Sequence, residues 1–129
     1  MMKTEQKVAE TEKVWQEHIE AWDASDLDGI MEHYTEESIM ILNNSVVQGT
    51  KGIRNVFANL FKLFNDGENK IDPAVIEGEV IYILWNFKPG PENGKSYFGS
   101  DTFVVQNSII TYQTIASQLY EKYTVIGQN

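Results

Sequence analysis

Apolar residues recur at three- and four-residue intervals in the first half of the chain, and at every second position in much of the second half. The first spacing is that of a helix with one buried face, and the second is that of a half-buried strand. The predicted helices span residues 4–24, 26–34 and 51–64. The predicted strands span residues 38–42, 46–48, 71–76, 80–87, 97–105 and 109–120. Helices followed by an antiparallel meander indicate an α+β fold, with the helices packed on one face of a curved sheet.

Two of the predicted helices carry wide apolar stripes. The stripe of the first helix is formed by Val8, Thr11, Trp15, Ile19 and Trp22. At about 100° per residue, His18 falls within the same stripe. The stripe of the third helix is formed by Ile53, Val56, Phe57, Leu60, Phe61 and Phe64. Ser25 and Thr50 are suited to cap the second and third helices. A strongly bent sheet covered by such helices encloses a cone, and the mouth of a cone is a pocket.

The strand at 97–105 has a single charged side chain on a face that is otherwise apolar. Alternate residues of a strand share a face, which places Asp101 beside Gly99 and Phe103. An isolated ionised carboxylate is costly in an apolar site, so Asp101 either finds a partner or stays protonated. Asp101 is therefore a candidate for a role in chemistry, and a structural acid that accepts backbone hydrogen bonds is the alternative.

The strand at 80–87 is apolar on both faces. One face, with Ile83, Trp85 and Phe87, is expected to line the cone. The other face, which includes Tyr82, then needs a cover from outside the chain. We therefore predict a homodimer that forms through the outer face of the sheet.

Length and charge narrow the possible functions. The chain has 129 residues, and residues 1–129 are expected to form a single domain. Its net charge of −9 disfavours nucleic acid and anionic membranes as partners. The absence of cysteine excludes disulfides and thiolate chemistry, and two histidines are too few for a typical zinc site, so no metal is expected. No segment has the apolar length of a signal peptide core or a membrane span, so the expected location is cytoplasmic.

Three segments carry a family resemblance. Residues 25–34 read SDLDGIMEHY, residues 49–54 read GTKGIR, and strands at 99–105 and 109–114 resemble a closing hairpin. In these features the chain resembles the NTF2-like superfamily, which includes the ketosteroid isomerases and the SnoaL-like polyketide cyclases. The resemblance implies a cone-shaped, cystatin-like α+β fold with three N-terminal helices, which is usually a homodimer packed sheet against sheet. The motifs are degenerate, so they identify the fold better than the activity.

The resemblance also implies site residues. Asp101 falls where the isomerases place a protonated aspartic acid that donates a hydrogen bond to the substrate oxygen. His18 falls at the position of their oxyanion-hole tyrosine, Tyr34 matches a supporting tyrosine, and Phe57 replaces another. Leu42 stands where their general-base aspartate is expected, and leucine cannot take a proton.

Asp101, His18 and Tyr34 are accordingly the candidate catalytic residues. The predicted binding residues are Trp15, Trp22, Phe57, Phe61, Ile83, Trp85, Phe87, Phe103, Tyr112 and Thr114. We expect Asp101 and His18 to line one cavity within hydrogen-bond reach, directly or through one water. The alternative for His18 is a core histidine bonded to a backbone carbonyl, and His33 is expected at the surface or at a helix end.

Two functional hypotheses follow. The first is a cofactor-free enzyme with an apolar pocket for a small hydrophobic molecule that bears a carbonyl group. Asp101 and His18 would then carry acid–base chemistry of the isomerase, cyclase or dehydratase type. The second is a non-catalytic ligand-binding or dimerisation domain, because Leu42 replaces the general base of the isomerases.

Overall fold

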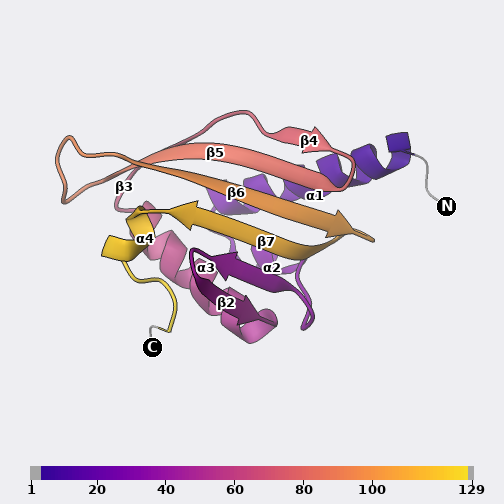
Figure 1. The fold of residues 1–129 in the computed structure, drawn as a ribbon, viewed down its shortest axis with the longest axis horizontal. Coiled ribbons are helices and arrows are strands. Elements are labelled where there is room, and N and C mark those ends of the chain that lie inside the picture. Colours follow the sequence, from indigo (N-terminus) through magenta and orange to yellow (C-terminus); the bar gives the residue numbers. More distant parts are fainter. Residues whose placement is uncertain (1–3, 128–129) are drawn as a thin grey trace.

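The chain folds into two layers, a curved sheet and a set of helices packed on one of its faces (Figure 1). The computed structural model describes residues 4–127. The helices are α1 (Thr4–Asp23), α2 (Leu27–Met31), α3 (Thr50–Phe64) and α4 (Leu119–Lys122). The strands are β1 (Ile39–Leu42), β2 (Ser45–Gln48), β3 (Gly67–Ile71), β4 (Val75–Glu77), β5 (Val80–Pro89), β6 (Tyr97–Gln106) and β7 (Ile109–Ser117). The predicted α+β fold, with three helices in the N-terminal half, is confirmed.

The seven strands of the described residues form one curved sheet that does not close on itself. The strand order is β2-β1-β7-β6-β5-β3, and β4 pairs with β5 beside this path. Every pairing is antiparallel except that of β1 with β7, which is parallel. The expected antiparallel meander is formed by β5, β6 and β7, whereas the parallel pairing at this edge was not predicted. A hydrophobic pattern locates a strand, but it does not fix the direction of a partner that lies far along the chain.

Several segment boundaries differ from the predictions, and two of these differences have a clear local cause. The strand predicted at 71–76 is two strands, because Pro73 lies in the break between β3 and β4 and has no backbone N–H for the ladder. The strand predicted at 109–120 ends at Ser117, and the short helix α4 follows it. The Ser117 hydroxyl accepts a hydrogen bond from the Leu119 backbone N–H at 3.1 Å, which favours the turn into this helix.

The helix caps also differ from the predictions. Asp26, not Ser25, caps α2, and its carboxylate accepts a hydrogen bond from the backbone N–H of Gly29 at 3.0 Å. Gly49, at a positive φ of 91°, stands at the N-cap of α3 in place of Thr50. The Glu36 carboxylate supplies the missing acceptor, because the Thr50 N–H donates to its Oε1 at 2.8 Å. The two carboxylates thus satisfy backbone N–H groups at the starts of α2 and α3.

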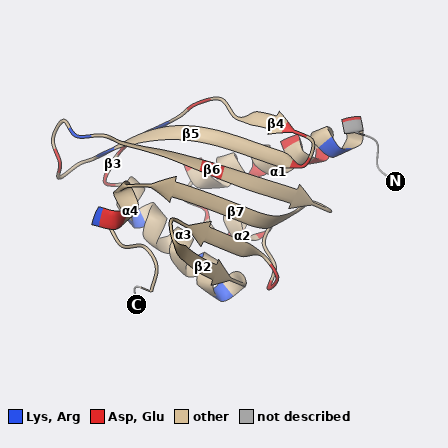
Figure 2. Cartoon of the chain, viewed as in Figure 1, with Lys and Arg blue, Asp and Glu red and all other residues tan. Residues whose placement is uncertain are grey.

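The three long strands β5, β6 and β7 carry almost no charge on their outer face, which is turned away from the helices. Strands β5, β6 and β7 contain only Lys88 and Asp101 as charged residues, and Figure 2 shows these strands almost entirely without charge colours. Several large apolar side chains on the strands are exposed: Ile41, Val46, Val75, Val80, Tyr82, Phe98 and Tyr112. The register places Val80, Val104 and Tyr112 in one row across the three central strands. This face is the one that the sequence predicts to need a cover.

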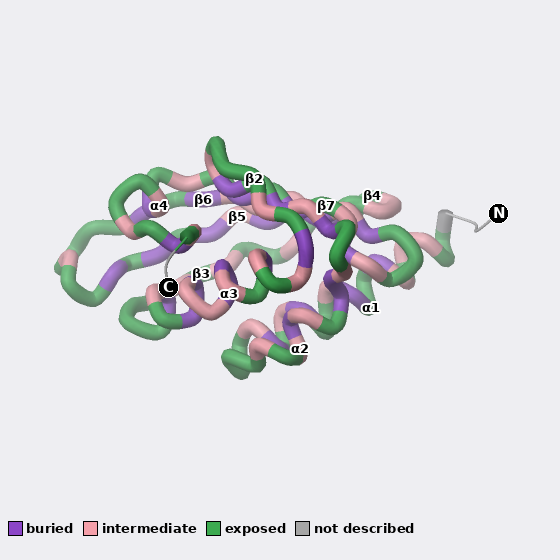
Figure 3. Tube along the Cα trace, turned by 90° about the horizontal axis from the view of Figure 1, so that it is seen from below, coloured by how far each residue is buried: buried purple, intermediate pink, exposed green. Residues whose placement is uncertain are grey.

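The core lies between the two layers, and Figure 3 shows buried positions on the sheet and on the helices that pack against it. On α1 the fully buried residues are Thr11, Val14, His18 and Ala21. The predicted stripe residues Trp15, Ile19 and Trp22 lie at its edge and are half-buried. His18 therefore sits at the centre of the buried stripe. Among the described residues, no helix is long and apolar enough to cross a membrane.

Candidate functional site

A cavity between the helices and the inner face of the sheet holds the main candidate residues. It measures about 50 Å³, counted as space open to the centre of a water molecule, whereas one water requires roughly 15 Å³. Side chains of α1, α3 and α4 and of β3, β5, β6 and β7 line it. His18 and Asp101 both belong to this lining, as expected.

Asp101 projects from the middle of β6 and accepts one hydrogen bond on each carboxylate oxygen. The indole Nε1–H of Trp85 donates to Oδ1 at 2.9 Å, and the amide Nε2–H of Gln113 donates to Oδ2 at 3.1 Å. The Gln113 Oε1 in turn accepts a hydrogen bond from the Tyr34 hydroxyl at 2.5 Å. A chain of hydrogen bonds from Tyr34 through Gln113 thus fixes the plane of the Asp101 carboxylate.

Burial dominates the electrostatics of Asp101. It raises the pKa of the carboxyl group from 3.8 to about 6, although the hydrogen bonds from Trp85 and Gln113 favour the ionised form. Asp101 is therefore mostly ionised at neutral pH and takes up a proton just below it. Such a group is able to accept and return a proton near physiological pH.

His18 lies across the cavity on α1, within a ring of aromatic side chains. Its imidazole packs on Phe103 at 5.1 Å, Phe57 at 5.8 Å and Trp15 at 5.9 Å between ring centroids. Burial, with a smaller effect of His33, lowers the pKa of His18 from 6.5 to about 3. The ring is therefore neutral at physiological pH. Its Nδ1 atom is buried and has no hydrogen-bond partner.

His18 and Asp101 share the cavity without touching. No hydrogen bond or ion pair joins them among the contacts of residues 4–127. The two side chains therefore do not form an ion pair. His18 also does not donate a hydrogen bond from Nδ1 to a backbone carbonyl, as the alternative for a core histidine would require. His33 follows the C-cap of α2, so it lies at a helix end as expected, but not at the surface: its side chain is buried and its Nε2 lies 3.1 Å from the Glu17 carboxylate.

Most of the predicted binding residues lie in the cavity wall. Those in the lining are Trp15, Trp22, Phe57, Ile83, Trp85 and Phe103. Phe87 is buried in the core outside the lining, and Phe61 faces a neighbouring surface groove. Tyr34 is buried behind Gln113 and reaches Asp101 only through it. The roles of these residues in binding stay predictions.

The expectation that Tyr112 and Thr114 line the pocket is wrong, because both side chains are exposed on the outer face of the sheet. A β-bulge explains the error. Val104 pairs with Tyr112 but Val105 pairs with Ile110, so β7 carries one extra residue at Thr111. The extra residue reverses the alternation of the strand. Gln113 and Ile115 therefore face the cavity in place of their neighbours.

Sequence reasoning missed Gln113, Asn69 and Tyr120, which all line the cavity. The sequence did contain a signal for Gln113: like Asp101, it is a polar residue among apolar strand positions. The bulge concealed on which face Gln113 lies. Asn69 lies in a polar edge strand, and Tyr120 lies on the short helix that was interpreted as the end of a strand. Neither pattern indicates an inward side chain.

Gly99 gives the Trp85 indole room to reach Asp101. The two residues face each other across β5 and β6, and a Cβ on Gly99 would lie 2.1 Å from the Cζ2 atom of Trp85. We expect Gly99→Ala to displace the indole, break its hydrogen bond to Asp101 and cost about 1–3 kcal/mol of folding free energy. Urea unfolding and the indole N–H resonance measure both effects. Ser100→Ala, on the other face of the same strand, is the control, and an unchanged indole resonance in Gly99→Ala would contradict the prediction.

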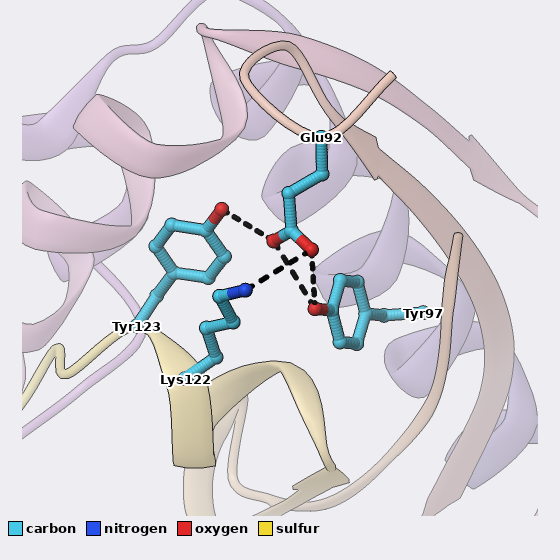
Figure 4. Close-up of polar contacts among 4 residues, drawn as sticks. All are labelled: Glu92, Tyr97, Lys122 and Tyr123. Atoms are coloured by element: carbon cyan, nitrogen blue, oxygen red, sulfur yellow. Dashed lines mark hydrogen bonds and ion pairs between the residues drawn. The ribbon is translucent and has the colours of Figure 1, made fainter. Parts of the chain in front are cut away.

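One wall of the cavity comes from the C-terminal segment, which is held in place by Glu92. Tyr120 of α4 lines the cavity, and its ring lies 6.1 Å from the Trp85 ring. Glu92, in the loop between β5 and β6, accepts hydrogen bonds from the hydroxyls of Tyr97 at 2.9 Å and Tyr123 at 2.5 Å (Figure 4). The Lys122 ammonium lies 3.3 Å from the same carboxylate. These contacts keep α4 against the end of the sheet.

The described residues offer no site for a metal, because no group of three or more His, Asp or Glu side chains is placed to hold an ion. The polar groups of the cavity lining are one carboxylate, one neutral imidazole, the amides of Gln113 and Asn69, the hydroxyl of Tyr120 and the indole N–H groups of its tryptophans. These groups are able to exchange a proton and to orient a carbonyl group.

Comparisons with known proteins agree with this fold. Residues 15–113 match the family model described as the SnoaL-like domain. No curated protein matches the chain. Among solved structures, the chain is similar to a candidate SnoaL-like polyketide cyclase from Jannaschia sp. CCS1, with 16% identity, a TM-score of 0.74, and coverage of 100% of this chain and 99% of that chain.

Two further solved structures are similar at the same level. One is an NTF2-like protein of unknown function from Mesorhizobium loti, with 13% identity, a TM-score of 0.76, and coverage of 86% of this chain and 93% of that chain. The other is AclR, a candidate hydroxylase from Streptomyces galilaeus, with 14% identity, a TM-score of 0.67, and coverage of 89% of this chain and 96% of that chain. At such identities the likeness concerns the fold alone.

The family model spans most of the cavity lining, from Trp15 on α1 to Gln113 on β7, and leaves out Ile115 and Tyr120. The chain therefore belongs to the SnoaL-like domain family, within the NTF2-like superfamily.

Proposed function

We propose that the cavity binds a small hydrophobic molecule with a carbonyl group and that Asp101 moves a proton on the carbon next to that carbonyl. One observation carries this proposal: a buried carboxylate that titrates near neutral pH and a neutral imidazole with an unpartnered nitrogen line the same apolar cavity. Groups whose pKa values are pushed apart by their surroundings divide the roles of base and hydrogen-bond donor between them.

In the proposed reaction, the ionised Asp101 carboxylate takes a proton from the carbon beside the carbonyl. The electron pair of the C–H bond moves toward the carbonyl oxygen and gives an enolate. The neutral His18 ring donates an N–H hydrogen bond to that oxygen. Where the substrate carries a C=C bond next to that carbon, the enolate is a dienolate, and return of the proton from Asp101 to its far carbon shifts the double bond and completes an isomerisation. Where the substrate carries a second carbonyl, attack of the enolate carbon on it forms a C–C bond and an alkoxide, and return of the proton from Asp101 to the alkoxide completes a cyclisation.

The roles differ from those that the resemblance implies. The ketosteroid isomerases keep an aspartic acid protonated at the position of Asp101 and place the base elsewhere. By the resemblance, Leu42 stands at the position of that base, and its side chain is buried outside the cavity lining. Asp101 is mostly ionised at neutral pH because its pKa is only about 6. It is therefore the side chain best placed to act as the base.

The test uses small cyclic ketones in heavy water. NMR measures how fast the hydrogens next to their carbonyl group are replaced by deuterium. We expect the chain to accelerate exchange, with a rate that rises through about pH 6 as Asp101 loses its proton. Asp101→Asn should slow the exchange by about 10²–10⁴-fold, because the base is lost. Asp28→Asn, an exposed carboxylate paired with Arg54, is the control and should leave the rate unchanged.

Binding of the ketones without any exchange would support the alternative, a non-catalytic ligand-binding domain. That alternative rests on Leu42, which deprives the chain of the general base of the isomerases. A lack of both binding and exchange would rule out the proposed pocket function. The small cavity volume directs the test toward ligands with one ring rather than several.

We also propose that the chain forms a homodimer through the outer face of the sheet. The exposed fractions of Tyr82, Phe98 and Tyr112 are 42%, 58% and 48%, and Lys88, near the end of β5, is the one charged residue that the three central strands present on this face. Exposed large apolar side chains on a face with so little charge are typical of a subunit interface. The proposal agrees with the sheet-to-sheet dimers that the family resemblance implies.

Analytical ultracentrifugation at micromolar concentration tests the assembly. We expect a dimer for the wild-type chain, and a monomer for a variant with Tyr82→Glu and Tyr112→Glu, because the interface would then bury unpaired charges. Glu121→Gln, an exposed residue of α4, is the control and should remain dimeric. A monomeric wild-type chain at these concentrations would contradict the proposal.

A further inference from the structure

The hydroxyl of Tyr120 opens on the cavity and has no partner in the described part of the chain. Tyr120 is half-buried on α4 and lines the cavity. Its hydroxyl forms no hydrogen bond with any of residues 4–127, and it is not one of the enclosed atoms that lack a partner. Those enclosed atoms are His18 Nδ1, His33 Nε2 and Asn69 Oδ1. A hydroxyl that is neither bonded nor enclosed borders open space, and the open space that Tyr120 lines is the cavity.

Tyr120 lies on the side of the cavity where Asp101 is held. Its ring stands edge-on to the indole ring of Trp85, with 6.1 Å between the ring centroids and 61° between the ring planes. The same indole donates its N–H to Oδ1 of Asp101 at 2.9 Å. Burial, and to a smaller extent the Asp101 carboxylate, raise the pKa of the Tyr120 hydroxyl well above its ordinary value of about 10. The hydroxyl therefore keeps its proton throughout the range in which Asp101 titrates.

The other polar side chains near Asp101 are less free to bind a ligand. The Gln113 amide donates to Asp101, and the Tyr34 hydroxyl donates to Gln113 and lies outside the cavity lining. A neutral His18 carries one N–H, and because its Nδ1 is enclosed, it reaches a ligand only when the proton is on Nε2. The Tyr120 hydroxyl rotates about its C–O bond and donates in either case.

The proposed reaction moves negative charge from Asp101 to the oxygen of the ligand. As the carboxylate takes the proton, it becomes neutral, and the enolate oxygen becomes charged. A donor that is free in the unliganded protein and lies beside the base forms its strongest hydrogen bond at that stage. A phenol hydroxyl is a stronger acid than an amide or indole N–H, so it is the better donor to an oxyanion.

We infer that Tyr120 is a further catalytic residue, whose hydroxyl donates a hydrogen bond to the carbonyl oxygen of the ligand and a stronger one to the enolate oxygen. The inference rests on the proposed function and adds to it a donor from the C-terminal helix α4. The hydroxyl keeps its proton, so Asp101 remains the group that takes and returns one. In this chain a histidine stands where the resemblance implies an oxyanion-hole tyrosine, and Tyr120 brings a phenol to the same cavity from another element.

The infrared carbonyl band of a bound ketone tests the contact directly, and it does so without turnover. Cyclopentanone and cyclohexanone are the probes, because a hydrogen bond to a carbonyl oxygen lowers the frequency of its stretching band. We expect the band of at least one bound ketone to move to higher frequency in Tyr120→Phe, since one donor is lost. Phenylalanine keeps the ring that packs on Trp85, so the variant retains the cavity wall.

The deuterium-exchange assay tests the catalytic role. Tyr120→Phe should lower the rate at saturating ketone by about 10–10²-fold and change KM little, because the hydrogen bond strengthens only as charge develops on the oxygen. Tyr123→Phe is the matched control: it removes a hydroxyl from the same segment, one that bonds Glu92. Tyr97 and Lys122 still hold Glu92 in that variant, so it should keep both the carbonyl band and the exchange rate of wild type.

A wild-type exchange rate in Tyr120→Phe, or a carbonyl band that does not move, would overturn the role of Tyr120 and leave the proposed function standing. Equal losses in Tyr120→Phe and Tyr123→Phe would do the same, because they would come from a loosened α4. Binding of ketones without exchange in the wild-type chain would overturn the catalytic role together with the proposed function. Binding of no ketone would overturn both as well.

Discussion

Asp101→Asn and His18→Phe will reveal opposite pH dependences of stability that cancel in the wild-type chain. Burial raises the pKa of Asp101 from 3.8 to about 6, so the folded state holds this proton more firmly than the unfolded state does. The stability gained is present below about pH 4 and is lost as the pH rises through about 6. A tenfold change in proton affinity corresponds to about 1.4 kcal/mol, which gives about 3 kcal/mol for Asp101.

His18 works in the opposite direction. Burial lowers its pKa from 6.5 to about 3, so the folded state binds the imidazole proton less firmly than the unfolded state does. Stability is therefore full above about pH 6.5 and is lost as the pH falls toward 3. Between about pH 4 and 6 this loss also amounts to about 3 kcal/mol. The two groups cancel in this window, and the wild-type free energy of unfolding should stay nearly level.

The variants separate the two contributions. In Asp101→Asn only the histidine titrates, so the free energy of unfolding, taken relative to wild type, should rise with pH by about 3 kcal/mol between about pH 4 and 6. In His18→Phe it should fall by a similar amount. Urea unfolding followed by tryptophan fluorescence at a series of pH values measures both. Profiles of both variants that run parallel to wild type would show that neither residue has the environment described.

Gln113→Met is expected to cost about 2–5 kcal/mol of folding free energy. Gln113 is 2% exposed and is the only link between the Tyr34 hydroxyl and Asp101. Methionine fills a similar volume and offers neither an amide donor nor a carbonyl acceptor. Two buried polar groups then lose their partners at once. The pKa of Asp101 should also rise further, because a hydrogen bond to its ionised form is lost.

A double-mutant cycle measures the energetic coupling between Tyr34 and Gln113. Tyr34→Phe alone removes only the hydroxyl and should cost about 1–3 kcal/mol, because Gln113 Oε1 loses its donor. In the Gln113→Met background the same change should cost less, since the partner is already absent. Urea unfolding gives the energies, and carbon NMR titration gives the Asp101 pKa. Additive losses of folding free energy, together with an unchanged Asp101 pKa, would refute the chain of hydrogen bonds from Tyr34 through Gln113 to Asp101.

The sequence was sufficient for the main elements and for the strand that carries Asp101. Alternation in β5 and β6 predicted which residues face the helices, because a strand with one buried face repeats every second residue. Helical spacing located α1 and α3 for the equivalent reason. The misfit of one carboxylate on an apolar face drew attention to Asp101, and the structure places it in the cavity wall.

Other features depended on contacts between residues far apart in the sequence. The extra residue at Thr111 is defined only by the pairing of β7 with β6, and it decides that Gln113 rather than Tyr112 faces the cavity. The parallel pairing of β1 with β7 and the wall formed by Tyr120 depend on the same long-range arrangement. None of these leaves a periodic signal in the chain.

The protonation states of Asp101 and His18 show most clearly what the sequence leaves open and the tertiary structure decides. From the sequence, Asp101 was a candidate either for a carboxylate with a partner or for a protonated acid, because residue types alone do not give burial. The tertiary structure encloses both groups, and desolvation disfavours the charged form of each, so the carboxyl pKa rises and the imidazole pKa falls. The sequence by itself determined the fold and that a carboxylate faces inward. Only the packing of distant strands and helices decided what that carboxylate can do.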